Sequence, residues 1–383
     1  MSGRVLLWCQ HLLGTGHLKR ATTLAAAMSA RGLDVTLASG GPPSGWLRVP
    51  GVRIAQLPWL RSASADFSAL RTEAGVAPDD AWWRGRVSAS LAALDRVGPD
   101  IVMTEMFPFG RRLFARELVP LLEAARARAG RPWVLASVRD VLVEPKSDAR
   151  HVEMAGWTSR YYDRVLVHSD PALVPFGASF RQAEAIADRI LYTGFVLDGG
   201  AAPPRGDPSG EILVSTGGGA VGADLLRTAL AARPLTRLAD APWRLIGGGN
   251  LAEATFAALG ADLPRTVVLE RHRDDFQSLL SACRLSVSQA GYNTVLEVLR
   301  AGRRAVFVPF GQGRETEQRT RAARVEAEGR AVCLAEAELS PERLAEAVDR
   351  ADALALPPAG TIDLEGASRT AAIVAALVGQ APP

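Results

Sequence analysis

Residues 288–297 have the sequence SQAGYNTVLE, and an apolar run lies on each side of them, LSV at 285–287 and AVFV at 305–308. This order predicts a strand, a glycine-containing turn, a short helix and a second strand. Gly291 lets the backbone of the turn come close to a ligand, because glycine has no side chain in the way. The stretch therefore indicates a parallel α/β sheet with a ligand at the end of one of its strands.

The helix after this turn is expected to begin near Asn293, and Asn293 or Thr294 suits its first position. Free N–H groups and the positive end of the helix dipole favour a phosphate at such a place. Glu297 lies one turn further along, where its carboxylate can accept hydrogen bonds from two sugar hydroxyls. An ordinary βα turn with Glu297 in solvent is the alternative, since glycine-rich turns are common in such sheets.

The composition is that of a two-domain globular protein. The chain has 383 residues, of which 48% are hydrophobic and 22% charged, enough for two hydrophobic cores. The net charge of +3 is small, which argues against a nucleic-acid partner. Three widely spaced cysteines form no metal or disulfide pattern, which fits a reducing compartment. No apolar run approaches the roughly 20 residues of a membrane span. We therefore expect a soluble cytoplasmic protein, and peripheral contact with the inner membrane face stays open.

The first half of the chain begins with a strand, a glycine-rich turn and a helix. Residues 5–9 (VLLWC) form a continuous apolar run, the turn follows at 10–20 (QHLLGTGHLKR), and a strongly helical segment ends at Gly32. A strand at 35–38 completes a βαβ unit, which predicts a right-handed crossover in a doubly wound sheet. A nicotinamide or flavin site is disfavoured, because no third glycine follows at the required spacing and no acidic residue ends the second strand.

Four polar side chains fall at the carboxyl ends of predicted strands, which is where ligands of such sheets bind. They are His17, Glu105, Arg139 and His168. The strand before His168 is expected at 161–167, and residues 60–80 are expected to form a loop with some helix.

Residues 197–210 (LDGGAAPPRGDPSG) are the clearest linker in the chain. We expect an N-terminal, acceptor-side domain at 1–196, a C-terminal domain at 211–360, and a final helix at 361–383 that packs back on the first domain. Both halves begin with a strand, a glycine-rich turn and a helix. The predicted fold class is therefore α/β, with two Rossmann-like doubly wound parallel-sheet domains that face each other across a cleft.

At these motifs the chain resembles glycosyltransferase family 28, the MurG-like group with the GT-B fold. The match is carried by GTGH at 14–17, TGGG at 216–219 and GYNTVLE at 291–297, with Gln318 further on. The resemblance implies that the C-terminal domain binds a UDP-sugar, that its Gly-Gly turn holds the diphosphate, and that Glu297 binds the ribose. Gln318 would contact the donor sugar, and Phe276 would lie near the uracil. The implied donor-binding residues are Gly14, Gly16, Thr216, Gly217, Gly218, Gly219, Phe276, Gly291, Asn293, Thr294, Glu297 and Gln318.

The N-terminal turn has a second resemblance. Residues 14–25 (GTGHLKRATTLA) are similar to the UDP-sugar hydrolase of pseudaminic acid synthesis, which shares the GT-B architecture. The histidine of that enzyme activates water. The two resemblances therefore agree on His17 and on a nucleotide-sugar, and they differ on whether water or an acceptor attacks.

Sugar transfer needs a base for the attacking hydroxyl and a stabilised diphosphate leaving group. A histidine titrates near neutrality, so His17 is the first candidate for the catalytic base. Glu105 is a second candidate base, or a carboxylate that orients the acceptor. A glycine-rich turn and a helix N-terminus can stabilise the diphosphate without metal, and the sequence contains no Asp-x-Asp motif. We therefore expect no metal, no cofactor, and inversion of the anomeric centre by direct displacement.

Three functions follow, in order of preference. The first is transfer of a sugar from a nucleotide-diphosphate donor, a UDP-sugar, to the hydroxyl of an unidentified acceptor. The second is hydrolysis of the UDP-sugar by water that His17 activates. The third, of another class, is a nucleotide-sugar-binding protein without activity, and the presence of His17 counts against it.

Overall fold

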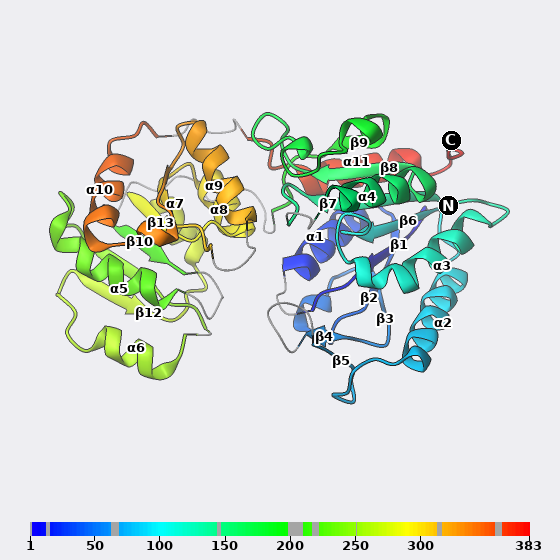
Figure 1. Ribbon diagram of the computed structural model, residues 1–383, viewed down its shortest axis with the longest axis horizontal. Helices are drawn as coiled ribbons and strands as arrows, with labels where there is room; N and C mark the ends of the chain where they lie inside the picture. The colour runs from blue at the N-terminus through cyan, green and yellow to red at the C-terminus, as the bar shows by residue number, and fades with distance from the viewer. Residues whose placement is uncertain are drawn as a thin grey trace. The chain divides into compact units, whose positions relative to one another are not determined.

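The computed structural model describes residues 2–12, 16–62, 69–143, 147–197, 210–216, 222–249, 251–311, 316–356 and 362–383. The chain divides into two compact units (Figure 1). Unit 1 is Met1–Asp198 together with Asp363–Pro383, and unit 2 is Gly199–Ile362. Of the predicted linker, only its two end residues, 197 and 210, lie within the described ranges.

Unit 1 is built on a parallel sheet of seven described strands in the order β3-β2-β1-β6-β7-β8-β9. The strands are β1 Arg4–Cys9, β2 Asp34–Ser39, β3 Val52–Gln56, β6 Ile101–Glu105, β7 Trp133–Arg139, β8 Arg164–His168 and β9 Ile190–Tyr192. The helices are α1 Gly16–Ala30, α2 Asp80–Val97, α3 Ala115–Arg126, α4 Asp148–Tyr161 and α11 Gly366–Leu377. Short 3-10 turns are η1 Gly45–Leu47, η2 Arg112–Phe114, η3 Phe176–Ala178 and η4 Glu184–Arg189.

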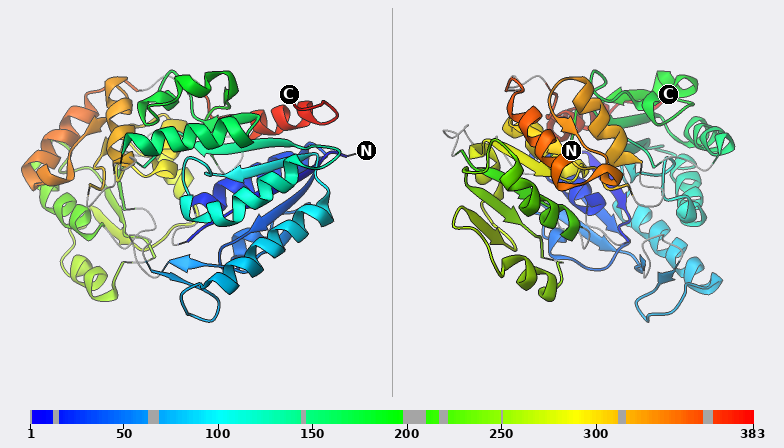
Figure 2. Two further views of the ribbon diagram at one scale, coloured as in Figure 1. Left: turned by 45° about the vertical axis from the view of Figure 1, so that its right-hand side comes forward. Right: turned by 60° about the vertical axis from the view of Figure 1, so that its left-hand side comes forward.

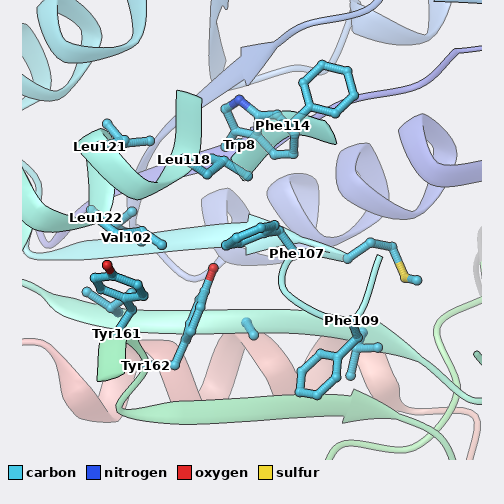
Figure 3. Close-up of a cluster of buried hydrophobic side chains, with 14 of the residues drawn as sticks. Trp8, Val102, Phe107, Phe109, Phe114, Leu118, Leu121, Leu122, Tyr161 and Tyr162 are labelled. Carbon is cyan, nitrogen blue, oxygen red and sulfur yellow. The ribbon is translucent and has the colours of Figure 1, made fainter. Parts of the chain in front are cut away.

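The central strand β1 is buried on both faces, which is why its sequence is continuously apolar. Leu6 and Trp8 belong to the hydrophobic cluster that lies under α2 and α3. In this cluster the rings of Trp8 and Phe114 pack edge to face, with their centroids 5.7 Å apart (Figure 3). Val5 and Leu7 point the other way, into a cluster with side chains of α1 and α11. Helices therefore cover both faces of the sheet, as a doubly wound fold requires.

Helix α11, drawn in red in Figures 1 and 2, packs against α1 although some 350 residues separate the two along the chain. Ala371 and Val374 are fully buried in the cluster that also contains Leu18 and Ala25 of α1. The start of α11 is also tied to the segment after β9, because the Gly366 N–H donates to the Phe195 carbonyl at 3.0 Å.

Unit 2 contains a parallel sheet of six described strands in the order β12-β11-β10-β13-β14-β15. The strands are β10 Ile212–Ser215, β11 Trp243–Ile246, β12 Val267–Glu270, β13 Leu285–Ser288, β14 Arg304–Phe307 and β15 Val332–Cys333. The helices are α5 Ala223–Ala232, α6 Glu253–Gly260, α7 Phe276–Ala282, α8 Tyr292–Ala301, α9 Glu317–Ala327 and α10 Pro341–Asp352, with 3-10 turns η5 Arg233–Leu235 and η6 Glu336–Glu338. The strand order reverses between β10 and β13, and ligands of doubly wound sheets bind at the carboxyl ends of strands at such a point.

Two local predictions were wrong. Residues 60–80 contain no helix in their described part before Asp80, where α2 begins; β4 (Arg61–Ser62) and β5 (Leu70–Arg71) pair there as an antiparallel hairpin. Tyr161 ends α4 instead of opening a strand, and β8 begins only at Arg164. The sequence analysis also missed α4 and α6. In the parts of the chain that the structure describes, no helix combines the length and the apolar character that a membrane span needs.

Candidate active site

The first group of candidate residues lies at the carboxyl edge of the unit 1 sheet. Strands β1 and β6 are parallel neighbours, with Trp8 opposite Thr104. Glu105 is the last residue of β6, and His17 stands in the first turn of α1, the helix that follows β1. The predicted pair, His17 and Glu105, is therefore brought together although 88 residues separate the two in sequence.

His17, Glu105 and Arg20 form one hydrogen-bonded cluster. Nδ1 of His17 lies 3.0 Å from Oε1 of Glu105, and Nη2 of Arg20 lies 3.3 Å from the same His17 nitrogen. Arg20 also forms an ion pair with Oε1 of Glu105. Glu105 has no exposed surface and Arg20 is only 5% exposed, whereas 22% of the His17 side chain is exposed. Of the three, His17 is therefore the one that a substrate can reach.

The electrostatics fix the protonation state of the cluster. Burial lowers the pKa of His17 to about 3, with Arg111 and Arg20 acting in the same direction and Glu105 opposing them. Burial alone would raise the pKa of Glu105, but His17 and Arg20 outweigh it and lower that pKa to about 2. At neutral pH the carboxylate is therefore ionised and can only accept hydrogen bonds.

The tautomer of the histidine follows from that charge. Because ionised Glu105 has no proton, Nδ1 of His17 is the donor in the 3.0 Å contact. A protonated Nδ1 cannot also accept from Arg20, so in this tautomer the 3.3 Å approach of the Arg20 Nη2 is a contact without a hydrogen bond, and Arg20 donates to Glu105. The other ring nitrogen, Nε2, then carries the lone pair. A neutral imidazole held by a carboxylate in this way can accept a proton from a hydroxyl, which is the chemistry of a general base.

Sequence reasoning missed two cations of this site, Arg20 and Arg111. Arg20 lies three residues after His17 on α1, and residues with that spacing share a helix face, so its position was available from the sequence. Arg111 is different. It has a positive φ of 57° at the end of the loop after β6, and only the path of that loop brings its charge close to Glu105.

The other carboxyl-edge histidine of unit 1 is enclosed. His168 has no exposed surface, and its ring nitrogens lie 2.7 Å from Oγ of Ser137 and 2.8 Å from Oγ1 of Thr193. Burial lowers the pKa of His168 to about 3. This ring links strands β7 and β8 to the segment after β9, which is a structural role. Of the predicted glycines, Gly14 lies outside the described residues, and Gly16 begins α1 with open space where a side chain would stand.

The second group of candidate residues surrounds the start of α8 in unit 2. The helix begins at Tyr292, one residue before the predicted start, and Gly291 is its N-cap in an extended conformation. The glycine N-cap gives no side-chain hydrogen bond to the first turn, which contains Asn293 and Thr294. A side-chain carbon added at Gly291 would meet only Oγ1 of Thr294, at 3.9 Å. The glycine N-cap therefore places no side chain of its own over the helix N-terminus, which suits phosphate binding by main-chain N–H groups.

Glu297 and Phe276 come from two helices that pack together, α8 and α7. Glu297 lines a small recess with Gln277, the neighbour of Phe276, and with Arg300. Both Glu297 and Phe276 are partly exposed. The two residues that the family resemblance assigns to ribose and base thus lie on adjacent helices.

Gln318 stands in the first turn of α9 and reaches the loop after β14, where its Oε1 accepts a hydrogen bond from the Phe310 N–H at 3.1 Å. One turn later, the nearly buried Arg321 donates to the Ala290 carbonyl at 3.0 Å, and its guanidinium lies 5.4 Å from the Tyr292 ring. Arg321 therefore supports the turn that precedes α8. No local pattern in the sequence indicates this role, because 31 residues separate Arg321 from the carbonyl to which it donates.

Thr216 follows β10, and its Oγ1 donates a hydrogen bond to the Gly247 carbonyl at 3.0 Å. This hydroxyl therefore stabilises the fold of unit 2. The predicted phosphate-turn residues Gly217, Gly218 and Gly219 lie outside the described part of the chain. Gly222, where the description resumes, has a φ of 150°, and an added side-chain carbon there would lie 2.4 Å from Cβ of Thr216. Only glycine fits at that position.

Comparisons with known proteins show first the fold and then the family of one domain. The chain covers the whole of CalG4, the calicheamicin glycosyltransferase, with a TM-score of 0.66 and 20% identity. It matches 96% of the Acinetobacter baumannii MurG structure with a TM-score of 0.59 and 18% identity. Both similarities lie at the level of the fold, and they confirm the predicted fold class: two doubly wound parallel-sheet domains of the GT-B type.

The family assignment rests on unit 2. The model of the glycosyltransferase family 28 C-terminal domain matches residues 212–360, so this part of the chain is a domain of that family. The predicted resemblance to family 28 is thereby confirmed.

Curated relatives are named as UDP-N-acetylglucosamine--N-acetylmuramyl-(pentapeptide) pyrophosphoryl-undecaprenol N-acetylglucosamine transferase. The protein of Methylibium petroleiphilum is 31% identical over 48% of this chain and 55% of its own length. That of Burkholderia cenocepacia is 27% identical over 67% of this chain and 64% of its own length. The chain thus matches little more than half of the first relative.

Proposed function

We propose that this chain is a glycosyltransferase that moves a sugar from a nucleotide-diphosphate donor to an acceptor hydroxyl. The observation that carries the proposal is the contact of 3.0 Å between Nδ1 of His17 and Oε1 of the buried Glu105. It leaves Nε2 of a partly exposed, neutral imidazole as a base. The family 28 domain at 212–360 supplies the class of reaction that such a base serves.

In the proposed reaction, Nε2 of His17 takes the proton of the acceptor hydroxyl. The hydroxyl oxygen forms the new bond to the anomeric carbon, while the bond from that carbon to the diphosphate oxygen breaks and the nucleoside diphosphate leaves with the electron pair. Glu105 holds the ring in the required tautomer and stabilises the imidazolium that forms. Because Glu105 is wholly buried, it acts as a positioning residue for His17. A single displacement inverts the anomeric centre.

The donor is proposed to bind unit 2 without a metal. The main-chain N–H groups at the start of α8 and the turn at 217–219 would hold the diphosphate, Glu297 the ribose, Phe276 the base and Gln318 the sugar. The helix dipole and oriented N–H groups can stabilise the leaving group's charge. A uridine nucleotide is favoured because the names of the related transferases begin with UDP-N-acetylglucosamine.

The first experiment is a thermal-shift panel of UDP, GDP and TDP and their common sugars, followed by product analysis of each sugar that stabilises the protein. Stabilisation by UDP, with the UDP-sugar left intact in the absence of an acceptor, is the expected result. Rapid release of free sugar would show that the protein hydrolyses the UDP-sugar, with His17 activating water, instead of transferring the sugar to an acceptor. No shift with any of the nucleotides would overturn the donor assignment.

A further inference from the structure

The loop after β6 ends at Arg111, a cation to which the proposed reaction gives no role. The main chain of this loop turns back on itself, because the Gly110 N–H donates to the Met106 carbonyl at 2.8 Å. Met106 directly follows Glu105, the last residue of β6, so this bond returns the chain to the end of that strand. The next residue is Arg111, which therefore starts beside the carboxylate that holds the base.

The loop is fixed by buried aromatic rings. The ring of Phe107 lies 5.1 Å from that of Trp157, and the ring of Phe109 packs edge to face on Phe176 at 5.1 Å (Figure 3 labels Phe107 and Phe109). Arg111 has a φ of 57°, a conformation that is costly for any residue except glycine. Such a conformation persists only where the surroundings impose it, which is common at binding sites and catalytic sites.

The guanidinium group of Arg111 has no partner in the described part of the chain. Its Nε is buried and forms no hydrogen bond. The nearby carboxylate of Glu105 forms its ion pair with Arg20 instead. Burial lowers the pKa of Arg111, and the charge of Glu105 opposes this effect. Part of the residue is nevertheless exposed, so a small molecule can reach it.

The surroundings of the base therefore carry one positive charge too many. Arg20 and Arg111 are cations, and Glu105 is the anion that they share. Burial keeps the His17 ring neutral, and it raises the pKa of the Cys9 thiol well above its usual range, so neither adds a negative charge. Buried charges in proteins are paired, because an unpaired one loses its hydration without compensation. The described residues leave room here for one more anion.

The kind of anion follows from the charge and the geometry of the group that binds it. One surplus positive charge matches one negative charge, and a guanidinium presents two parallel N–H donors that fit the two oxygens of a carboxylate. A phosphate dianion would exceed the surplus. His17 acts on a hydroxyl in the proposed reaction, so the carboxylate and the hydroxyl would belong to the same small molecule.

We propose that Arg111 binds a carboxylate, and that the acceptor whose hydroxyl His17 deprotonates is a hydroxy acid. The carboxylate pairs with the guanidinium, and the hydroxyl lies at Nε2 of His17. This inference rests on the proposed function for the role of His17. The carboxylate site itself belongs to unit 1 and can be tested without any donor or turnover.

The test uses three small probes with the same carbon chain. Glycerate has a carboxylate, glycerol has no charge, and glycerol 3-phosphate has a phosphate. Each is titrated into protein with ¹⁵N-labelled histidine, and the ring signals of His17 are identified by their absence in His17→Gln. Glycerate should shift these signals saturably, with a Kd of about 1 mM. Glycerol should cause no shift, and glycerol 3-phosphate should bind more weakly than glycerate.

The variants assign the effect to one guanidinium. Arg111→Gln should bind glycerate about tenfold more weakly, as for loss of a charged hydrogen bond, and Arg111→Lys should lose less. The matched control is Arg112→Gln on the same loop, because the side chain of Arg112 is 54% exposed and pairs with Glu153. That variant should bind glycerate as the wild type does.

A second measurement separates binding from a structural role. Arg111→Gly removes both the unpaired charge and the side chain that makes a positive φ costly. Its melting temperature should be at least that of the wild type, although it no longer binds glycerate. A residue that only holds the loop in place would give the opposite result, a lower melting temperature.

Four results would overturn the proposal. Absence of any shift with glycerate, or equal glycerate affinity in the wild type and Arg111→Gln, would mean that the guanidinium binds no carboxylate. An equal loss in Arg112→Gln would make the effect one of general charge. Tighter binding of glycerol 3-phosphate would make this a phosphate site. A lower melting temperature of Arg111→Gly would make Arg111 structural. The UDP thermal shift does not depend on any of these results, so failure here and failure of the proposed function are distinguishable.

Discussion

The two candidate sites differ in the groups that they use: buried side chains in unit 1 and main-chain N–H groups in unit 2. In unit 1, three charged or titratable side chains, His17, Arg20 and Glu105, are packed into mutual contact with little or no exposure. In unit 2, the N-cap of α8 is an extended glycine, Gly291, which places no side chain of its own over the start of the helix. A base needs a free lone pair, and burial keeps the His17 ring unprotonated at neutral pH by lowering its pKa. A phosphate needs several N–H donors, and a helix N-terminus provides them without any side chain.

Because of this difference, substitutions in the two sites should have different effects. Substitutions in the unit 1 cluster should change chemistry and stability, because they disturb buried charge. Substitutions at the unit 2 turn should change nucleotide affinity and leave the fold intact, because the side chains there are partly exposed.

The largest effect is expected for His17→Ala, which removes the base. Turnover should fall by about a thousandfold, within the 10²–10⁴ that a general base contributes. UDP affinity, measured by calorimetry, should stay within about twofold of the wild type, since the proposed donor site is in the other unit. Turnover near the wild-type rate in this variant would show that another group is the base.

The next effect is expected for Glu105→Gln. The change leaves Arg20 and Arg111 without their shared anion in a buried place, and breaking a buried ion pair costs about 3–5 kcal/mol. The free energy of unfolding, measured with urea, should fall by an amount near the lower end of that range. The matched control is Glu338→Gln, whose side chain is 58% exposed beside Arg343. That variant should lose less than about 1 kcal/mol. Equal losses of unfolding free energy in Glu105→Gln and Glu338→Gln would mean that the buried cluster stabilises the fold no more than an exposed ion pair does.

A smaller effect is expected from acid. Burial lowers the pKa of His168 to about 3, below the value of about 6.5 in an unfolded chain. The neutral ring therefore contributes stability that is fully present above pH 6.5 and is lost as the pH falls from 6.5 toward 3. Between pH 7 and 5.5 the wild type should lose about 1 kcal/mol more unfolding free energy than His168→Gln.

The control for the acid experiment is His272→Gln in unit 2, because 75% of the His272 side chain is exposed. Its stability should follow the wild-type curve over the same pH range. Parallel curves for wild type and His168→Gln would mean that His168 is not buried in its neutral form.

The smallest effects on stability are expected at the unit 2 turn. Glu297→Ala should weaken UDP binding about tenfold, as for loss of a hydrogen-bonded charged group. Gly291→Ala should leave the free energy of unfolding within about 0.5 kcal/mol, because φ is −60° there and the added carbon has room. Gly291→Ala should still weaken UDP binding, because the added methyl group occupies space that the phosphates need beside the N-terminus of α8. Unchanged UDP affinity in both variants would mean that the nucleotide binds elsewhere.

The sequence by itself determined the fold class, the two sheets and the identity of the motifs. Continuous apolar runs such as 5–9 predict buried parallel strands, and the glycine-containing turn at 288–297 predicts the strand–helix junction that the structure contains. These features are local. The period of the apolar residues, the helix propensities and the conformational freedom of glycine act within a few residues, so they can be recognised in one short segment.

Only the tertiary structure decided which charges meet. The ion pair of Arg20 with Glu105 spans 85 residues, and the support of the Ala290 carbonyl by Arg321 depends on how α9 packs. Arg111 reaches the cluster through a loop with positive φ values at Met106 and Arg111. The packing of α11 on α1 is long-range in the same sense. The pKa of His17 depends on burial and on these distant charges, and no local pattern in the sequence encodes either of them.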